Sequence, residues 1–363
     1  MKARQPFVSV IIPVRNEARY IEACLRSLLR GGYPAARWEI ILADGMSTDG
    51  TREIIARVAA DAAVPIYIAD NPRGTIPHAL NLAIAGARGE IIIRADAHAR
   101  YPREYVARCV RTLRRQGADN VGGPVTTAPG ADTVMARAIA LALSHPFGVG
   151  NSAFRTTHTA RETDTVPFGC FPASVFRRIG LFDERLRRNE DYEFNRRLRR
   201  AGGHIWLDPA LASTYYSRDT LGGLLRQAWE NGMWNALSHA LHPAIRTPRH
   251  VLPLFFTLGA LALAVTAAPL PWMPPLALPL RLGYGAYALL ALLVSARLAR
   301  RRGWRLFPAL LALFPLFHFT YGAGIAWGWL RVLARRYPWR PEDGIPACAP
   351  RPDTAAVTEP SRW

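Results

Sequence analysis

The sequence contains one lysine, Lys2, four cysteines, and no acidic residue between positions 251 and 336. The cysteines lie far apart and form no Cys-x-x-Cys pair, which argues against a disulfide framework or a structural zinc site. The chain is nonetheless basic, because 46 Lys and Arg outnumber 27 Asp and Glu and leave a formal net charge of +19. With 363 residues, half of them hydrophobic, the chain can bury a core, which excludes a disordered or acidic protein.

The basic charge suggests two kinds of partner, and its distribution favours a membrane. Residues 251–336 carry nine arginines, which flank long uncharged runs rather than polar or aromatic residues. Nucleic-acid grooves instead place basic side chains among polar and aromatic groups along the phosphates. Basic residues beside apolar runs contact anionic lipid headgroups. We therefore expect a membrane partner and no nucleic acid.

Three apolar runs near residues 252–272, 276–296 and 306–330 predict three membrane segments. About 20 apolar residues cross the hydrocarbon core of a bilayer. The alternative is that these runs are buried helices of a large soluble domain, which their length disfavours.

The N-terminal apolar run at residues 7–14 does not have the features of a signal peptide. It is short, contains Pro13, and continues into Arg15 and Glu17 without a small-residue cleavage site. We therefore expect residues 1–235 to stay in the cytoplasm at the inner or plasma membrane. An arginine cluster between the second and third apolar runs agrees with this topology by the positive-inside rule. The cluster consists of Arg297, Arg300, Arg301, Arg302 and Arg305.

The basic residues after the third apolar run conflict with that topology. If residues 306–330 span the membrane fully, these basic residues lie outside, which the positive-inside rule disfavours. Alternatively, Pro308 and Pro315 break the run into a re-entrant or interfacial hairpin whose two ends stay inside. Both arrangements remain open. The basic residues are Arg331, Arg335, Arg336 and Arg340.

The first 130 residues alternate between strand-like and helix-like segments. Strands are predicted at residues 7–12, 39–43, 65–69 and 90–95, and helices at 18–30, 51–60 and 76–87. The strand segments are almost continuously apolar, as in a parallel sheet that is covered on both faces. This βαβ series predicts an α/β fold with a mostly parallel sheet, whose ligands bind beyond the carboxyl ends of the strands.

Polar residues gather at the carboxyl ends of three of these strands. The first strand is followed by Glu17, the second ends at Asp44, and the fourth is followed by Asp96 and His98. Parallel strands bring these ends to one edge of the sheet, so we expect a site there. Asp44 and Asp49 each precede a glycine, so both could be turn or helix-cap residues. We favour that explanation for Asp49, and a ligand-binding role for Asp44 at the strand tip.

Asp96 and His98 are two side chains that can bind metals. In an extended segment alternate residues share a face, so a carboxylate and an imidazole would lie on the same side. Together they could hold a divalent cation that bridges the phosphates of a ligand. The alternative is that His98 is a surface-loop histidine, and the position after an apolar strand, on the same edge as Asp44, favours the metal ligand.

Four segments, in this order, resemble a family 2 glycosyltransferase with the GT-A fold. They are Phe-Val-Ser-Val-Ile-Ile-Pro-Val-Arg-Asn-Glu at 7–17, Ala-Asp-Gly-Met-Ser-Thr-Asp-Gly-Thr at 43–51, Arg-Ala-Asp-Ala-His at 94–98, and Asn-Glu-Asp-Tyr-Glu-Phe-Asn-Arg-Arg-Leu at 189–198. The Asp-Ala-His variant, His-Pro-Phe-Gly-Val-Gly-Asn at 145–151 and the C-terminal apolar runs are similar to membrane-anchored succinoglycan-type glucosyltransferases. The resemblance covers about two thirds of the chain.

The resemblance implies roles for the residues at the strand ends. Pro13, Glu17 and Asp44 would line the nucleotide pocket, with the Asp44 carboxylate accepting from the base. Asp96 and His98 stand where the family has its Asp-x-Asp motif, so they would bind the ribose, the diphosphate and a Mg²⁺ or Mn²⁺ ion. His98 departs from the family, which has a carboxylate there. Because imidazole is a softer ligand, this departure favours Mn²⁺.

Asp191 matches the catalytic base of the family, and its chemistry supports that role independently. A sugar nucleotide has a good leaving group once a cation neutralises its diphosphate, so the protein needs to supply a base for the attacking hydroxyl. One carboxylate opposite the leaving group does this in a single inverting displacement. The alternative is that Glu190 and Asp191 only complement the dipole of a helix that runs to about residue 201. We expect an orienting or solvated role for Glu190.

A helix is predicted at residues 221–241, with apolar and aromatic side chains that would lie on the membrane surface or cover the active site. Processive synthases of the family carry Gln-x-x-Arg-Trp in this region. Here Gln227 is followed by Ala228, Trp229, Glu230 and Asn231, so the Arg-Trp pair is missing. This difference, together with few membrane segments, favours the transfer of a single sugar.

The sequence thus predicts a membrane-anchored inverting glycosyltransferase that moves a sugar from a UDP-sugar to a lipid-linked acceptor in exopolysaccharide or cell-surface glycan assembly. The expected domains are a GT-A domain at 1–235, an interfacial connector at 236–250, a membrane region at 251–336 and a disordered tail at 337–363. The alternatives are a processive polysaccharide synthase and a non-catalytic membrane scaffold with a decayed transferase domain.

Overall fold

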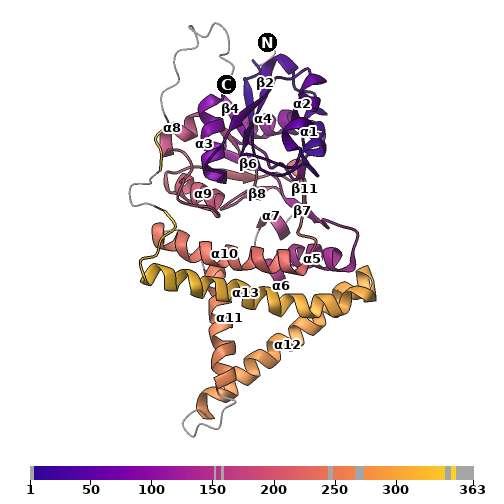
Figure 1. Cartoon of the computed structure of the whole chain (residues 1–363), viewed down its shortest axis with the longest axis vertical. Coiled ribbons are helices and arrows are strands. Elements are labelled where there is room, and N and C mark those ends of the chain that lie inside the picture. The colour runs from indigo at the N-terminus through magenta and orange to yellow at the C-terminus, as the bar shows by residue number, and fades with distance from the viewer. Residues whose placement is uncertain are drawn as a thin grey trace. The chain divides into compact units, whose positions relative to one another are not determined.

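The computed structural model of the chain describes residues 4–150, 153–156, 159–243, 248–265, 274–339 and 345–348 (Figure 1). The chain divides into two compact units, each built from separate stretches of sequence. The first unit comprises Met1–Thr126, Thr157–Tyr215 and Trp339–Trp363, and the second comprises Thr127–Thr156 and Tyr216–Pro338.

An eight-stranded, mostly parallel sheet forms the centre of the first unit. Its strands are β1 Val8–Val14, β2 Trp38–Asp44, β3 Ile66–Asp70, β4 Ile91–Arg94, β6 Asn120–Gly122, β8 Arg161–Glu162, β9 Cys170–Pro172 and β10 Ile205–Leu207. The strand order is β3-β2-β1-β4-β9-β6-β10-β8. Strands β1, β2, β3 and β4 are parallel to one another. Strand β9 is antiparallel to both of its neighbours, β4 and β6. Strand β8 is antiparallel to β10.

Helices connect the strands of the first unit. They are α1 Ile21–Leu29, α2 Thr51–Ala60, α3 Ile76–Gly86, α4 Tyr105–Gln116, α8 Ser174–Ile179 and α9 Glu190–Arg200, with the 3₁₀ turns η1 Ala35–Arg37 and η2 Pro209–Leu211. Three short strands, β5 Ala99–Arg100, β7 Val125–Ala128 and β11 Ser213–Tyr216, form a second sheet in the order β5-β11-β7.

The strand order places a topological switch point between β1 and β4. The chain moves from β1 outward to β2 and β3, and then returns through α3 to β4 on the other side of β1. Because right-handed crossovers in opposite directions lie on opposite faces, α3 covers the face opposite to α1 and α2. Ligands of open α/β sheets bind at such a point, beyond the carboxyl ends of the strands.

The predicted α/β fold is confirmed, and most element boundaries differ by only a few residues. Helix α2 has the predicted bounds, and β2 is buried along its whole length, as its continuous apolar sequence indicates. The expectation of burial on both faces is wrong for β3, which is only partly buried because it forms the edge of the sheet. Strand β1 extends one residue beyond Pro13. Proline is tolerated there because pairing of β1 with β4 ends at Ile11.

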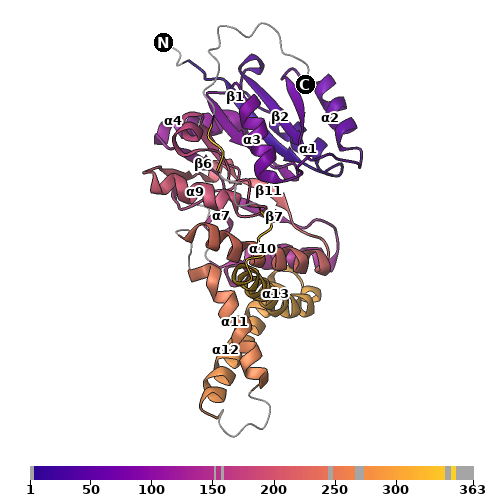
Figure 2. The same cartoon turned by 60° about the vertical axis from the view of Figure 1, so that its left-hand side comes forward.

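Helices make up most of the second unit. They are α5 Val134–Ser144, α6 Pro146–Val149, α7 Ala153–Thr156, α10 Leu221–Leu241, α11 Pro248–Val265, α12 Pro274–Arg302 and α13 Phe307–Leu333, with the turn η4 Trp304–Leu306. Helix α10 has the predicted bounds. Within this unit, α11 and α12 extend away from the pair α10 and α13 (Figure 1, Figure 2).

Two helices of the second unit are long and apolar enough to cross a membrane. These stretches are Leu278–Arg302 and Trp304–Leu333, whereas Val251–Val265 is a shorter apolar helix. The last part of the first predicted segment, residues 266–272, lies outside the described residues. Helix α13 continues through Pro315, and Pro308 lies in its first turn, where proline is tolerated. The predicted alternative of a hairpin broken at these prolines is therefore wrong.

A short part of the C-terminal tail packs in the first unit. The backbone N–H of Leu181 donates to the carbonyl of Pro346 at 3.0 Å. Ile345 lies against Gly180, whose φ of +79° is readily adopted by glycine. The expectation of a disordered tail therefore does not hold for residues 345–348.

Helices α10 and α13 pack closely through glycines. A Cβ atom on Gly232 of α10 would lie 2.1 Å from the carbonyl oxygen of Tyr321 on α13. In return, a Cβ on Gly324 of α13 would lie 2.3 Å from the carbonyl oxygen of Trp229 on α10. Only glycine allows the two backbones to come this close.

Substituting Gly232 by alanine should destabilise the second unit, because the new methyl group forces α10 and α13 apart. The matched control is Gly222→Ala in the same helix, where a Cβ meets no atom within 4 Å. Overpacking costs about 1–3 kcal/mol, whereas replacing a helical glycine by alanine gains roughly 0.5–1 kcal/mol. Thermal unfolding in detergent should therefore show a lower midpoint for Gly232→Ala and an equal or higher one for Gly222→Ala. Equal shifts in the two variants would contradict the close contact.

Candidate functional site

The predicted site residues Pro13, Glu17, Asp44, Asp96, His98 and Asp191 all lie in the first unit. The parallel register pairs the end of β1 with the end of β2, through Val14 and Asp44. The structure brings four of these residues together in two groups. Asp96 and Asp191 meet at one arginine, while Glu17 meets His98.

Arg94, the last residue of β4, joins three carboxylates. It is 4% exposed, and its NH1 donates to Oδ1 of Asp191. Its NH2 lies 3.2 Å from Oε1 of Glu190 and 3.4 Å from Oδ1 of Asp96. Burial disfavours the charged guanidinium, but the carboxylates of Asp96 and Glu190 outweigh it and raise the pKa of Arg94. One buried cation therefore connects the predicted base to a predicted donor-binding residue.

Sequence reasoning did not assign a role to Arg94, although its position contains a signal. The residue follows Ile91, Ile92 and Ile93 in a fully buried strand. An arginine in a run of buried apolar residues requires ionic partners, because an unpaired buried charge is strongly unfavourable. Two of its partners come from α9, far along the chain, and the sequence of β4 alone does not identify them.

Glu190 has an orienting position. It is 6% exposed and bonds to Arg94, so of the two expected roles, orienting or solvated, the solvated one is wrong. Helix α9 begins at Glu190 because Asn189 adopts a φ of +66°, a left-handed conformation that asparagine tolerates. This turn places Glu190 and Asp191 in the first helical turn, beside Arg94. The predicted start of the helix at Glu190 is confirmed.

His98 and Glu17 form the second group. The Nδ1 atom of His98 lies 2.9 Å from Oε1 of Glu17, and the two side chains are 30% and 20% exposed. The imidazole also packs edge-on against Tyr215, with ring centroids 5.1 Å apart. A carboxylate at one ring nitrogen fixes the orientation of the imidazole, an arrangement that is common at histidines whose other nitrogen binds a metal.

Asp44 is fully buried at the tip of β2 and organises the following loop. The backbone N–H of Ser47 donates to Oδ2 of Asp44 at 3.2 Å, and the Ser47 hydroxyl donates to Oδ1. The Arg52 guanidinium lies 3.4 Å from Oδ2. The structure thus shows Asp44 holding its own loop, and contact of its carboxylate with a nucleotide base stays a prediction.

Hydrogen bonds connect the loops that follow β1 and β2. The backbone N–H of Asn16 donates to the Ser47 hydroxyl at 2.9 Å, and the backbone N–H of Thr48 donates to the Asn16 side-chain oxygen at 2.9 Å. Asn16 has a φ of +53°, which asparagine tolerates. No role was predicted for Asn16 or Ser47, because only the three-dimensional contact reveals their link.

Asp49 has the structural role that the sequence favours. Its Oδ1 accepts from the backbone N–H of Thr51 at the start of α2, and its Oδ2 accepts from Ala18 at 3.1 Å. The hydrogen bond from the Thr51 hydroxyl lowers the pKa of the Asp49 carboxyl. Asp49 therefore connects the start of α2 to the loop after β1.

The side chains present fit a divalent cation held jointly with a ligand. The described residues contain no group of three or more His, Cys, Asp or Glu side chains placed to hold a metal by themselves. A cation on a diphosphate needs few protein ligands, because phosphate oxygens and water complete its shell. Residues 96–98 are not extended, because residues 97 and 98 form a turn closed by the hydrogen bond from the Ala99 N–H to the Asp96 carbonyl at 3.2 Å. The expectation that the two side chains share a face of an extended segment is therefore wrong. The Asp96 carboxylate and the imidazole of His98, oriented by Glu17, would still supply one oxygen and one nitrogen donor. This mixed set suits Mn²⁺ better than Mg²⁺.

Comparison with known families agrees with this arrangement. Residues 9–182, which include β1, β2, β4 and β9, match the family described as Glycosyl transferase family 2. This range ends before Asp191, so the match itself does not include the predicted base.

Two relatives extend the similarity beyond that range. Over 329 residues the chain is 32% identical to the succinoglycan biosynthesis protein ExoA of Rhizobium meliloti, with 90% of this chain and 96% of ExoA covered. Over 233 residues it is 28% identical to a dolichyl N-acetyl-alpha-D-glucosaminyl phosphate 3-beta-D-2,3-diacetamido-2,3-dideoxy-beta-D-glucuronosyltransferase of Methanococcus voltae, with 62% of this chain and 72% of that protein covered.

A solved structure shares the fold. The mannosyltransferase PcManGT from Pyrobaculum calidifontis, in complex with GDP-Man and Mn²⁺, aligns with a TM-score of 0.56 and 20% identity over 88% of each chain. At this identity the likeness concerns the fold alone. Together with the near full-length similarity to ExoA, it shows that this chain belongs to glycosyl transferase family 2 and is a glycosyltransferase with the GT-A fold.

Proposed function

We propose that the chain is an inverting glycosyltransferase that moves a single sugar from a UDP-sugar to a lipid-linked acceptor at the cytoplasmic face of a membrane. The observation that carries this proposal is the position of Asp191. Its carboxylate is one-third exposed, and Arg94 holds it next to Asp96 at the carboxyl end of β4. A base and a donor-binding carboxylate are thus joined by one guanidinium at the switch point of the sheet.

The base would act on the acceptor hydroxyl. Oδ1 of Asp191 is engaged by Arg94, so we assign the proton transfer to Oδ2. As the hydroxyl oxygen bonds to the anomeric carbon, the bond to the diphosphate breaks and the proton passes to Asp191. Attack from the face opposite the leaving group inverts the anomeric configuration.

Asp96 and His98 are the residues that would hold a Mg²⁺ or Mn²⁺ ion. When bound, the ion supplies charge that offsets the negative charge of the departing diphosphate. Glu17 would orient His98 for this role through the contact at Nδ1. Pro13, Glu17 and Asp44 would border the nucleotide, with Asp44 fixing the loop that approaches the base.

A membrane-bound acceptor would explain the apolar helices of the second unit. The region proposed to reside in the membrane is residues 251–336, after a catalytic region at 1–235 and an interfacial connector at 236–250. The names of the relatives support such a substrate, because ExoA is named for succinoglycan biosynthesis and the name of the M. voltae transferase includes a dolichyl-linked sugar phosphate. Exopolysaccharide or another cell-surface glycan is the product class that we propose.

The first prediction concerns the donor. Full-length protein in detergent should hydrolyse or transfer from UDP-sugars in a panel that also contains GDP-mannose. Activity should require a divalent cation, be lost with a chelator, and return more fully with Mn²⁺ than with Mg²⁺, because His98 offers a nitrogen ligand. The measurement is the nucleoside diphosphate released.

The outcomes of the donor panel separate the alternatives. A preference for GDP-mannose would overturn the UDP-sugar assignment while leaving the enzyme class intact. Polymer formed from the donor alone would indicate a processive synthase. Absence of turnover and of nucleotide-sugar binding would favour a non-catalytic scaffold.

The second prediction concerns the base. Asp191→Asn keeps an oxygen for Arg94 but cannot take a proton, so transfer to the acceptor should fall by about 10²–10⁴-fold. Donor binding should change little. The control is Asp61→Asn, an exposed carboxylate after α2. Transfer by Asp191→Asn at the rate of the Asp61→Asn control would exclude Asp191 as the base.

The third prediction concerns Arg94. Arg94→Met removes the cation that compensates Glu190 and Asp96, and breaking a buried ion pair costs about 3–5 kcal/mol. The unfolding midpoint should drop strongly. The double variant Arg94→Met with Glu190→Gln should regain part of the stability, because no buried charge remains at Glu190, but it should stay inactive. Full activity of the double variant would show that Arg94 does not position the site.

A further inference from the structure

The exposed residues of α13 form one apolar face. Every exposed side chain along the helix is apolar, and their spacing of three or four residues, or twice that, places them on the same side. Leu330 is 56% exposed and Leu333 is 77% exposed. We call this set the α13 stripe. It consists of Pro308, Ala312, Leu316, Phe319, Trp327, Leu330 and Leu333.

The opposite face of α13 is covered by protein. Gly324 and Gly328 contact the backbone of α10, and the side chain of Asn235 donates to the hydroxyl of Tyr321 at 3.0 Å. Leu310, Leu313 and Phe314 lie in a buried cluster with residues of α5 and with Leu224 of α10. Residues early in α10 contact residues early in α13, and later residues contact later ones, so the two helices are parallel.

This pairing is difficult to reconcile with α13 crossing a membrane. Helix α10 carries Arg226 in its second turn and Glu230 near its middle. A charged side chain near the centre of a bilayer costs about 2.5–3.5 kcal/mol. If α13 stood upright, its close partner α10 would be carried into the hydrocarbon with it. A helix that lies in the plane of the interface avoids this cost, because its polar partner stays on the water side.

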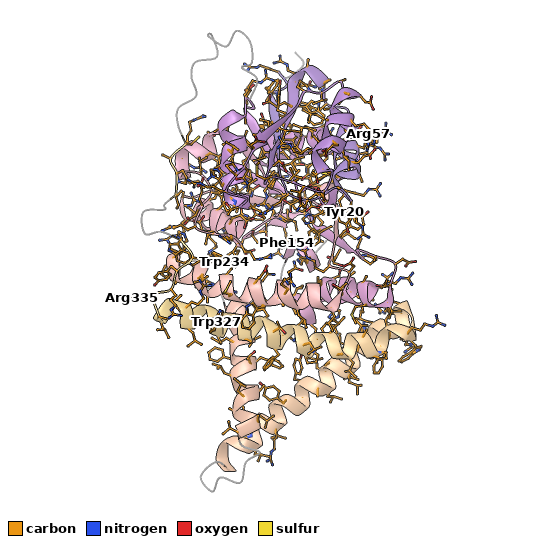
Figure 3. The ribbon with its side chains drawn as sticks, in the orientation of Figure 1. Tyr20, Arg57, Phe154, Trp234, Trp327 and Arg335 are labelled. Atoms are coloured by element: carbon orange, nitrogen blue, oxygen red, sulfur yellow. The ribbon has the colours of Figure 1, made fainter. Side chains whose placement is uncertain are left out.

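The arginines that precede and follow α13 in the sequence also favour a helix that lies in the plane of the interface. Before the helix come Arg300, Arg301, Arg302 and Arg305, which are exposed, and after it come the exposed Arg335 and Arg336. Figure 3 labels Trp327 on α13 and Arg335 just beyond its end. If α13 lies flat, both groups face the same anionic headgroups, and the conflict with the positive-inside rule disappears.

Helices α11 and α12 continue the apolar surface. Leu252 and Phe255 of α11 and Leu282 of α12 are each more than 60% exposed. The two helices contact each other where the ring of Tyr284 lies 5.3 Å from that of Phe256. The backbone of Gly322 on α13 contacts the Pro253 carbonyl of α11, so α11 leaves α13 beside the stripe.

We propose that α11 and α12 form a hairpin inserted into the membrane, and that α13 lies in the cytoplasmic headgroup region with the α13 stripe inserted toward the acyl chains. The partner that covers the α13 stripe is an anionic lipid bilayer. The third apolar run is therefore an interfacial helix, although it is long enough to span. This inference rests on the membrane association proposed above, and its test separates the two.

The first experiment determines which side of the membrane each end of α13 faces. Cys24, Cys109 and Cys170 are fully buried, so replacing only the half-exposed Cys348 by serine leaves little background labelling. In this background, Arg302→Cys and Arg336→Cys mark the two ends of α13. In inside-out membrane vesicles a membrane-impermeant maleimide should label both cysteines equally. Labelling of Arg336→Cys only after permeabilisation would show that α13 spans the membrane and overturn the proposal.

The second experiment measures depth with nitroxide labels in vesicles of phosphatidylglycerol and phosphatidylethanolamine. Leu316→Cys and Leu330→Cys lie about 21 Å apart along the helix axis, and should report the same shallow depth, within about 5–10 Å of the headgroup boundary. The control, Leu289→Cys on an exposed position of α12, should report a deeper position.

Each outcome of the depth measurement has a distinct meaning. A large difference in depth between positions 316 and 330 would overturn the flat orientation. Water exposure or protein contact at both positions, with Leu289→Cys still in lipid, would show that something other than lipid covers the stripe. Water exposure at all three positions would overturn the membrane association itself.

Discussion

The charge balance around Arg94 is the constraint on which the site depends. Three carboxylates, from the segment after β4 and the start of α9, lie within reach of one buried guanidinium. Without that cation their mutual repulsion and the cost of burying Glu190 would drive the start of α9 away from the sheet. With it, a residue that would take a proton and a residue that would hold a diphosphate are kept in fixed positions. The geometry of the site thus depends on a residue that need not touch either substrate.

Much of the first unit could be predicted from the sequence, because local patterns are strong there. Apolar strands and amphipathic helices alternate regularly, and the carboxyl ends of parallel strands necessarily meet at one edge. For this reason Glu17, Asp44, Asp96 and His98 could be placed at one edge of the sheet, and the structure shows direct contact between Glu17 and His98. The motif beginning at Asn189 also indicated where α9 starts, and the structure confirms it.

The pairing between these residues could not be predicted in the same way. The contacts of Arg94 with Glu190 and Asp191 connect positions almost a hundred residues apart, and the sequence around either end does not name its partner. The partial exposure of β3 depends on its place at the sheet edge, which strand order decides. The course of α13 was likewise ambiguous, because a spanning helix and an interfacial helix buried on one side can share length and composition. The contacts of Gly232 and Gly324 between α10 and α13, on which the proposed interfacial course rests, are visible only in three dimensions.

The chain path between the two units has a consequence for the order of folding. The first unit is assembled from three stretches of sequence, and the last of them follows the apolar helices. The hydrogen bond from the backbone N–H of Leu181 to the carbonyl of Pro346 can form only after Pro346 has been synthesised. During translation, the apolar helices therefore leave the ribosome before the transferase unit is complete. If these helices insert as proposed, insertion can begin before the last segment closes the first unit.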